Sequence, residues 1–142
     1  MKTLFSFLML TVYITLLDSR WVSYATPLDT AVYFTEGSFW EILAKANEEK
    51  KIVFVDIYAT WCGPCKLLKK TTFTDKELGE YFNTHFINVA IDGETSEGRN
   101  LMQLYQVRAY PTMLFINPDG SIRQSVVGYH SANQLLKVAR KL

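Results

Sequence analysis

The sequence predicts an α/β domain in which a mixed β-sheet is flanked by helices on both faces. Two apolar, strand-like segments, residues 52–59 and 86–91, alternate with segments of helical periodicity, an order typical of parallel strands joined by helices. Two further strand-like segments, residues 111–116 and 122–127, are joined by the turn sequence Asn-Pro-Asp-Gly. This pattern predicts a terminal hairpin, which adds an antiparallel pair to the sheet.

The N-terminal half of the domain is expected to hold an edge strand, a capped helix and a central strand. Residues 31–34, Ala-Val-Tyr-Phe, predict a short edge strand. Ser38 followed by Glu41 predicts a capping box at the start of a helix that ends near residue 50. The segment 52–59 is apolar apart from one aspartate and one tyrosine, which predicts a strand buried on both faces.

The C-terminal half is expected to add further helices between and after the strands. Residues 66–70 predict a short helix. Thr74 and Glu77 predict a second capping box and the helix that follows it. The polar stretch 92–97 leads into another helix, and residues 131–142 close the chain as an amphipathic helix.

Residues 1–25 differ in composition from the rest of the chain. A positively charged start precedes the mainly apolar run 4–17, and Ser23 and Ala25 place small residues before a cut after Ala25. This layout is typical of a secretory signal peptide, and the apolar run is shorter than the roughly 20 residues that span a membrane. We therefore expect residues 1–25 to be a cleaved signal and residues 26–142 to be one exported domain. If the signal is not cleaved, it would anchor the domain to the membrane.

Composition excludes several classes of function. Without residues 1–25 the basic and acidic residues are equal in number, so nothing indicates nucleic acid or an anionic membrane surface as a partner. A zinc site needs about four ligands, whereas the chain has two cysteines and two distant histidines. Haem attachment would require a histidine where Lys66 follows the second cysteine. We expect no metal and no cofactor.

The two cysteines, Cys62 and Cys65, lie in the segment Trp-Cys-Gly-Pro-Cys-Lys, between a predicted strand and a predicted helix. Two thiols at this spacing can alternate between a dithiol and a disulfide, although a structural staple is also open in an exported protein. A helix N-terminus favours a thiolate, so Cys62 is the expected nucleophile. Cys65 lies one turn deeper, and we expect it to be the more buried and to resolve the mixed disulfide.

Over nearly all of residues 26–142 the chain resembles the thioredoxin-fold oxidoreductases, and exported bacterial members in particular. Four features occur in the family's order: Asp56 six positions before the first cysteine, the segment Trp61–Lys66, a strand ending in Ile91–Asp92, and Tyr110-Pro111-Thr112 followed by Gly128. The resemblance implies the thioredoxin fold and a periplasmic location. It also implies activity on disulfide-containing proteins, and we expect the protein to be a monomer.

The resemblance also implies roles for residues near the cysteines. Asp56 would exchange a proton with Cys65, although a carboxylate that only hydrogen-bonds within the sheet is the alternative. Pro111 would be a cis-proline opposite the cysteines, with Tyr110 at a position where thioredoxins often have isoleucine. Asn88 stands where thioredoxins usually have a lysine near the buried acid. Three residues of the cysteine segment would complete the substrate-binding surface, namely Trp61, Gly63 and Pro64.

The function that these features predict is an exported thiol–disulfide oxidoreductase that reduces protein disulfides. Histidine between the cysteines favours oxidation in related proteins, and Gly63-Pro64 is typical of the reducing type. The resemblance implies a membrane-bound reductase as electron donor. Two alternatives remain open at this point: a disulfide oxidase or isomerase, and a non-catalytic thioredoxin-fold binding module.

Overall fold

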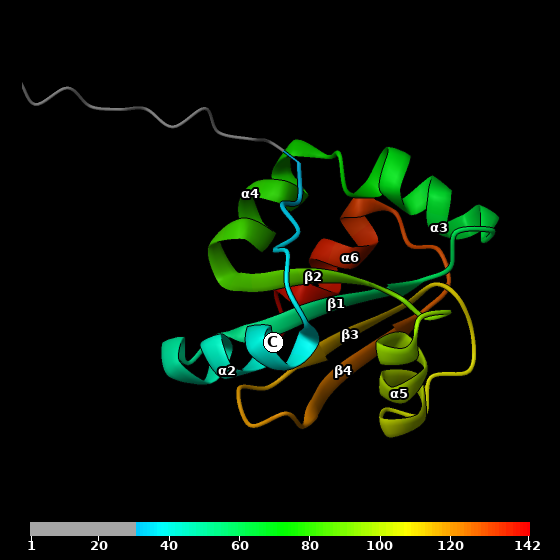
Figure 1. Cartoon of the computed structure of the whole chain (residues 1–142). Coiled ribbons are helices and arrows are strands. Elements are labelled where there is room, and N and C mark those ends of the chain that lie inside the picture. Colours follow the sequence, from blue (N-terminus) through cyan, green and yellow to red (C-terminus); the bar gives the residue numbers. More distant parts are fainter. Residues whose placement is uncertain (1–30) are drawn as a thin grey trace, which may run out of the picture.

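The computed structural model describes residues 31–142, so the predicted signal peptide at residues 1–25 lies outside the described residues. A four-stranded sheet has the order β2-β1-β3-β4, in which β1 runs parallel to β2 and antiparallel to β3, and β3 pairs with β4 as a hairpin (Figure 1). The mixed sheet predicted from the sequence is therefore confirmed. The strands are β1 (Ile52–Tyr58), β2 (Phe86–Asp92), β3 (Thr112–Ile116) and β4 (Ile122–Val127).

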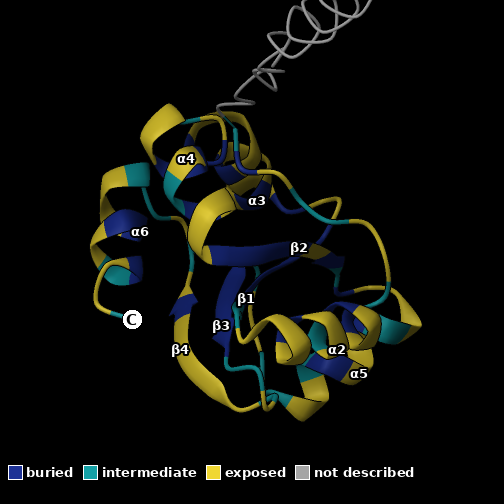
Figure 2. Cartoon of the chain, turned by 90° about the vertical axis from the view of Figure 1, so that its left-hand side faces the viewer, coloured by how far each residue is buried: buried dark blue, intermediate teal, exposed yellow. Residues whose placement is uncertain are grey.

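Helices cover both faces of this sheet, as Figures 1 and 2 show from two directions. On one face lie α2 (Phe39–Glu49) and α5 (Ser96–Leu104). The other face carries α3 (Gly63–Leu67), the π-helix η1 (Leu68–Thr72), α4 (Lys76–His85) and α6 (Ala132–Ala139). Among the described residues, no helix has the length and apolar character needed to cross a membrane.

The central strand β1 separates two apolar clusters because successive side chains point to opposite faces. Val53, Val55 and Ile57 pack with α2 and α5. Phe54 packs on the opposite face in a group of aromatic rings that includes Phe82 of α4. By the same alternation Asp56 points to the face of Phe54, which is the face that carries α3 and η1. The fold thereby aims the one acidic side chain of β1 toward the cysteine helix.

Two local predictions are wrong. Residues 31–34 form no strand; instead they cross β2 as an extended segment, with the Val32 amide donating to the Phe73 carbonyl at 2.8 Å and the Thr35 amide to the Asn88 carbonyl at 2.7 Å. The segment makes isolated hydrogen bonds to two different elements, so no ladder forms.

The second predicted capping box is also absent. Asp75 is the N-cap of α4 and accepts the Leu78 amide at 2.9 Å, whereas the Thr74 hydroxyl donates to the Lys70 carbonyl at 2.9 Å. Because Thr74 closes the end of the preceding helix, the next helix begins one residue later than predicted. The box at Ser38 and Glu41 is confirmed, with both reciprocal hydrogen bonds present.

Candidate active site

Cys62 and Cys65 form a disulfide where the chain leaves β1 and enters α3. Cys62 is the N-cap of α3, and its Sγ accepts a hydrogen bond from the Cys65 amide at 3.2 Å. This contact places a backbone N–H group on the sulfur that would carry negative charge after reduction. The prediction that Cys65 is the more buried of the two is wrong for the disulfide state. The exposed fractions are 3% for Cys62 and 5% for Cys65, and the Tyr58 and Tyr110 side chains pack against the cluster that the two cysteines form with Ala59.

The two residues between the cysteines leave the approach to the disulfide open. A Cβ atom built on Gly63 would meet no other atom within 4 Å. Pro64 lies in the first turn of α3, where a missing N–H group removes no intrahelical hydrogen bond. Both residues are exposed. A partner chain could therefore reach this turn without displacing side chains of this protein.

Trp61 and Tyr110 form an aromatic wall beside the disulfide. The two ring centroids are 5.7 Å apart, and 68% of Trp61 is exposed. The peptide bond between Tyr110 and Pro111 is cis, and the Pro111 carbonyl accepts the Gly128 amide at 2.8 Å. Tyr110 thus joins the segment before β3 to the cysteine turn.

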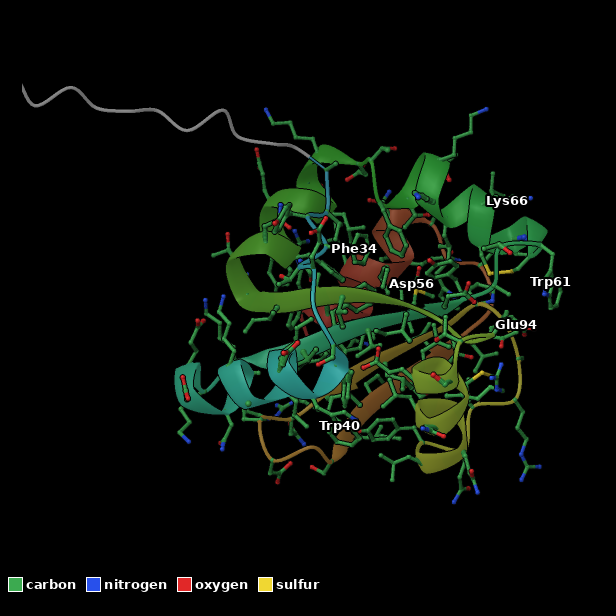
Figure 3. All side chains as sticks on the ribbon, in the orientation of Figure 1. Phe34, Trp40, Asp56, Trp61, Lys66 and Glu94 are labelled. Carbon is green, nitrogen blue, oxygen red and sulfur yellow. A yellow bond between two sulfur atoms is a disulfide. The ribbon has the colours of Figure 1, made fainter. Side chains whose placement is uncertain are left out.

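The position of Tyr110 depends on residues that sequence reasoning did not single out. Its hydroxyl lies 3.0 Å from both the Glu94 Oε1 atom and the Met102 Sδ atom. A Cβ atom on Gly93 would lie 2.3 Å from that hydroxyl, so only glycine leaves room for the ring. Figure 3 shows Glu94 and Trp61 at the same end of the molecule. No motif marks Glu94, because its proximity to Tyr110 arises only when the turn after β2 meets the segment before β3.

Asp56 is buried behind the disulfide, with 6% of the residue exposed, and its Oδ1 atom has no hydrogen-bond partner. Burial raises the pKa of this carboxyl to about 7, against a smaller opposing effect of the Lys69 charge. Asp56 and Cys65 line one pocket of about 420 Å³. The structure therefore places a carboxyl whose pKa is raised by burial in the same pocket as the second cysteine. The pocket is completed by Phe34, Tyr58, Ala59, Thr60, Lys66, Lys69, Phe73 and Ala90.

The Asn88 side chain makes its hydrogen bonds away from Asp56. In the parallel pairing of β1 with β2, Asn88 lies opposite Phe54, whereas Asp56 lies opposite Ala90. The Asn88 side chain donates to the Tyr33 carbonyl at 3.1 Å and to Asn83 Oδ1 at 3.2 Å. Its observed contacts thus fix the extended segment before α2.

Within residues 31–142, no group of three or more histidine, cysteine, aspartate or glutamate side chains is arranged to hold a metal ion. The chemistry that the site offers is that of its two sulfurs, one buried carboxyl and the lysines near it.

Comparisons with known proteins agree with this geometry. The thioredoxin-like domain family model matches residues 40–142. The thiol:disulfide interchange protein DsbD of Pseudomonas fluorescens is 34% identical over 98 residues, which cover 67% of this chain and only 17% of that protein. A thioredoxin H-type protein of Picea mariana is 37% identical over 111 residues, covering 77% of this chain and 81% of the relative. A solved structure from Bacteroides thetaiotaomicron, proposed to be a disulphide-isomerase, has a TM-score of 0.69 and 46% identity, covering 78% of this chain and 91% of that one.

Proposed function

Because the chain belongs to the thioredoxin-like domain family of thiol–disulfide oxidoreductases, we propose that it is an exported enzyme that reduces disulfides in other proteins. The observation that carries the proposal is the Cys62–Cys65 disulfide at the start of α3, with Asp56 in the pocket behind Cys65. A structural staple would require neither a buried titratable carboxyl nor an open turn between the cysteines.

In the first step the reduced enzyme attacks with the Cys62 thiolate. The Cys65 amide that contacts Cys62 Sγ in the disulfide supports this assignment, because an N–H donor stabilises negative charge on sulfur. The new bond joins Cys62 to one substrate sulfur, and the other substrate sulfur leaves with the electron pair and takes a proton from solvent. The product is a mixed disulfide.

In the second step Cys65 resolves that mixed disulfide. The Asp56 carboxylate accepts the Cys65 proton, and the resulting thiolate attacks Cys62 Sγ. The Cys62–Cys65 disulfide forms, and the second substrate sulfur leaves as a thiolate that is then protonated. Two electrons have passed from the cysteine pair to the substrate. A carboxyl with a pKa of about 7 suits this exchange because it changes protonation state near neutral pH.

The substrate would be an extended protein segment that lies across the open turn. In this proposal Trp61, Gly63 and Pro64 contact the segment from the cysteine turn, and Tyr110 and Pro111 contact it from the chain that leads into β3. Trp61, Gly63 and Pro64 are exposed, and the half-buried Tyr110 packs against Trp61, which supports a docking role for this surface; Pro111 itself is buried.

The reducing direction and the cellular setting complete the proposal. Gly63 and Pro64 place no histidine next to the sulfurs, which favours the reductase over the oxidase. An exported reductase meets an oxidising compartment and must be reduced again by a dithiol donor. We propose a membrane-bound reductase as that donor and the bacterial periplasm as the location, with the enzyme acting as a monomer.

Reduction of insulin with dithiothreitol as electron donor tests the proposed activity. We expect the wild type to accelerate precipitation of the insulin B chain and Cys62→Ser to be inactive. Circular dichroism of the variant controls for folding. If the wild type and the variant were equally inactive, this result would contradict the proposed enzymatic function and favour a binding module.

A second candidate function is disulfide isomerisation. It is favoured by the likeness to the Bacteroides protein proposed to be a disulphide-isomerase. Reactivation of scrambled ribonuclease in a glutathione buffer, compared with reduction of insulin, separates the two activities. Rapid reactivation of ribonuclease together with slow reduction of insulin would favour an isomerase function over the proposed reductase function.

A further inference from the structure

The pocket behind the disulfide contains a lysine to which the reaction above assigns no role. Lys69 belongs to η1 and lines this pocket together with Asp56 of β1 and Cys65 of α3. Four positions separate Cys65 from Lys69, so the two lie on the same face where α3 passes into η1. Lys69 is an exposed residue and lines the solvent side of the pocket, whereas Asp56 is buried.

Asp56 has few other groups to compensate its charge. Its sheet neighbours are Ala90 of β2 and Met113 of β3, which offer no charge. Phe34 covers the pocket from the extended segment before α2 and is apolar as well. The Oδ1 atom of Asp56 has no hydrogen-bond partner, so no hydrogen bond to that atom compensates the charge of the carboxylate.

The charged and titratable groups that face this carboxyl come from three elements. Tyr58 lies on the same strand, Cys65 and Lys66 come from α3, and Lys69 comes from η1. Of the two lysines, Lys69 is the one whose positive charge opposes the effect of burial on the pKa of Asp56. No ion pair within the described residues joins Lys69 to Asp56, so the charge acts at longer range than a direct contact.

We propose that Lys69 is a positioning residue for the resolving step, and that its ammonium group keeps one negative charge in the pocket while the proton of Cys65 passes to Asp56. This inference rests on the proposed function. The transfer converts a carboxylate and a thiol into a carboxylic acid and a thiolate, so the pocket holds one negative charge before and after it. The lysine neither gains nor loses a proton, and its charge stabilises both arrangements over the neutral pocket, in which the acid and the thiol are both protonated.

Titration of Asp56 in the oxidised protein tests the inference without any substrate. The cysteines do not titrate as a disulfide, so the carboxyl carbon resonance of Asp56 reports its own protonation. We expect the midpoint in Lys69→Met to lie above that of the wild type by about half a pH unit to one unit, less than a direct ion pair gives. Lys69→Arg should keep the wild-type midpoint. Lys70→Met serves as the matched control, since Lys70 lies on the same helix outside the pocket lining, and it should leave the midpoint unchanged.

The pH profile of insulin reduction links this titration to the reaction. Since Asp56 must be ionised to take the proton, the acid limb of the profile should move to higher pH in Lys69→Met by the same interval as the midpoint, which is about a threefold to tenfold loss of rate on that limb. A rate that falls equally at every pH would indicate a structural defect and overturn the inference. The inference would also be overturned if the titration midpoint of Asp56 were the same in Lys69→Met and in Lys70→Met. A midpoint that moved only in Lys66→Met would overturn it as well. A wild type inactive on insulin would instead overturn the proposed function.

Discussion

The indole ring of Trp61 stands edge-on to the phenol ring of Tyr110, with ring centroids 5.7 Å apart and ring planes inclined by 79°. Trp61 belongs to the cysteine turn and Tyr110 to the segment before β3, so this contact joins the two sides of the site. The Tyr110 hydroxyl is held by Glu94 and Met102 at 3.0 Å each. The wall beside the disulfide is therefore fixed by packing at one ring and by polar contacts at the other.

Removing the Tyr110 ring should weaken the binding of protein substrates more than the binding of small disulfides. We expect Tyr110→Ala to raise the KM for insulin by about tenfold, equivalent to about 1.4 kcal/mol of lost docking. The rate with a small aromatic disulfide should change by less than about twofold, because such a compound does not need the wall. Steady-state kinetics with both substrates measure the contrast.

Tyr110→Phe is the matched control for this contrast. It keeps the ring against Trp61 and loses only the hydroxyl contacts, so its KM for insulin should stay close to that of the wild type. An equal loss on both substrates in Tyr110→Ala would mean that the tyrosine affects the sulfurs rather than docking.

Burial of Asp56 predicts a specific dependence of stability on pH. Its pKa is about 7 in the folded protein against an ordinary value near 3.8, so between those values the folded state retains a proton that the unfolded state has released. The free energy of unfolding should therefore fall as pH rises from about 4 to about 7, and stay reduced above that.

Asp56→Asn removes this effect. Its free energy of unfolding should exceed that of the wild type at pH 8 by an amount on the order of 2 to 4 kcal/mol, with little difference at pH 4. Urea denaturation of the oxidised proteins at both pH values is the measurement. The exposed Asp119 provides the control variant Asp119→Asn, which should show no such gain. Parallel pH curves for the wild type and Asp56→Asn would contradict the burial argument.

The two cysteines should differ in the covalent complexes that they leave behind. Cys65→Ser cannot resolve the mixed disulfide, so Cys62 should stay bound to substrate proteins. Cys62→Ser lacks the nucleophile and should capture few or none. Non-reducing gels followed by mass spectrometry identify the captured proteins, and dithiothreitol should release them. Capture by Cys62→Ser in equal amount would reverse the assignment of the nucleophile.

Asn88 should contribute to stability through the segment before α2. Asn88→Ala loses the hydrogen bonds to the Tyr33 carbonyl and to Asn83, which we expect to lower the free energy of unfolding by about 1 to 3 kcal/mol. Amide exchange at Tyr33 and Thr35 should accelerate, because both amides belong to the segment that Asn88 holds. Asn47→Ala, which alters an exposed asparagine, is the control. Unchanged exchange at the two amides would show that the segment is held by other contacts.

Most of the fold was predictable because its signals are local. The period of apolar residues marked the strands, and Ser38 with Glu41 marked the start of α2. Residues 31–34 failed as a strand since their apolar pattern fits any extended segment, and only the tertiary contacts decide whether a ladder forms. Thr74 failed as an N-cap because Asp75 beside it is also a capping residue, and the end of η1 engages the threonine.

The candidate site was predictable where a motif defines it and not where it depends on the meeting of distant elements. Cys62 and Cys65 follow from their spacing, and Asp56 follows from the resemblance to the thioredoxin-fold oxidoreductases. Glu94 belongs to the site because it accepts a hydrogen bond from the hydroxyl of Tyr110, and Lys69 belongs to it because it lines the pocket of Asp56. Neither neighbour leaves a pattern in the sequence, since each depends on how two loops or helices pack.

The equilibrium redox potential of the Cys62–Cys65 pair tests the proposed reductase function most directly. Equilibration of the protein with thiol–disulfide buffers of known potential, followed by alkylation of free thiols and mass spectrometry, measures the reduced fraction. We expect a potential close to the value of about −270 mV known for thioredoxin. A potential of about −180 mV or higher, in the range of disulfide isomerases and oxidases, would contradict the proposed reductase function.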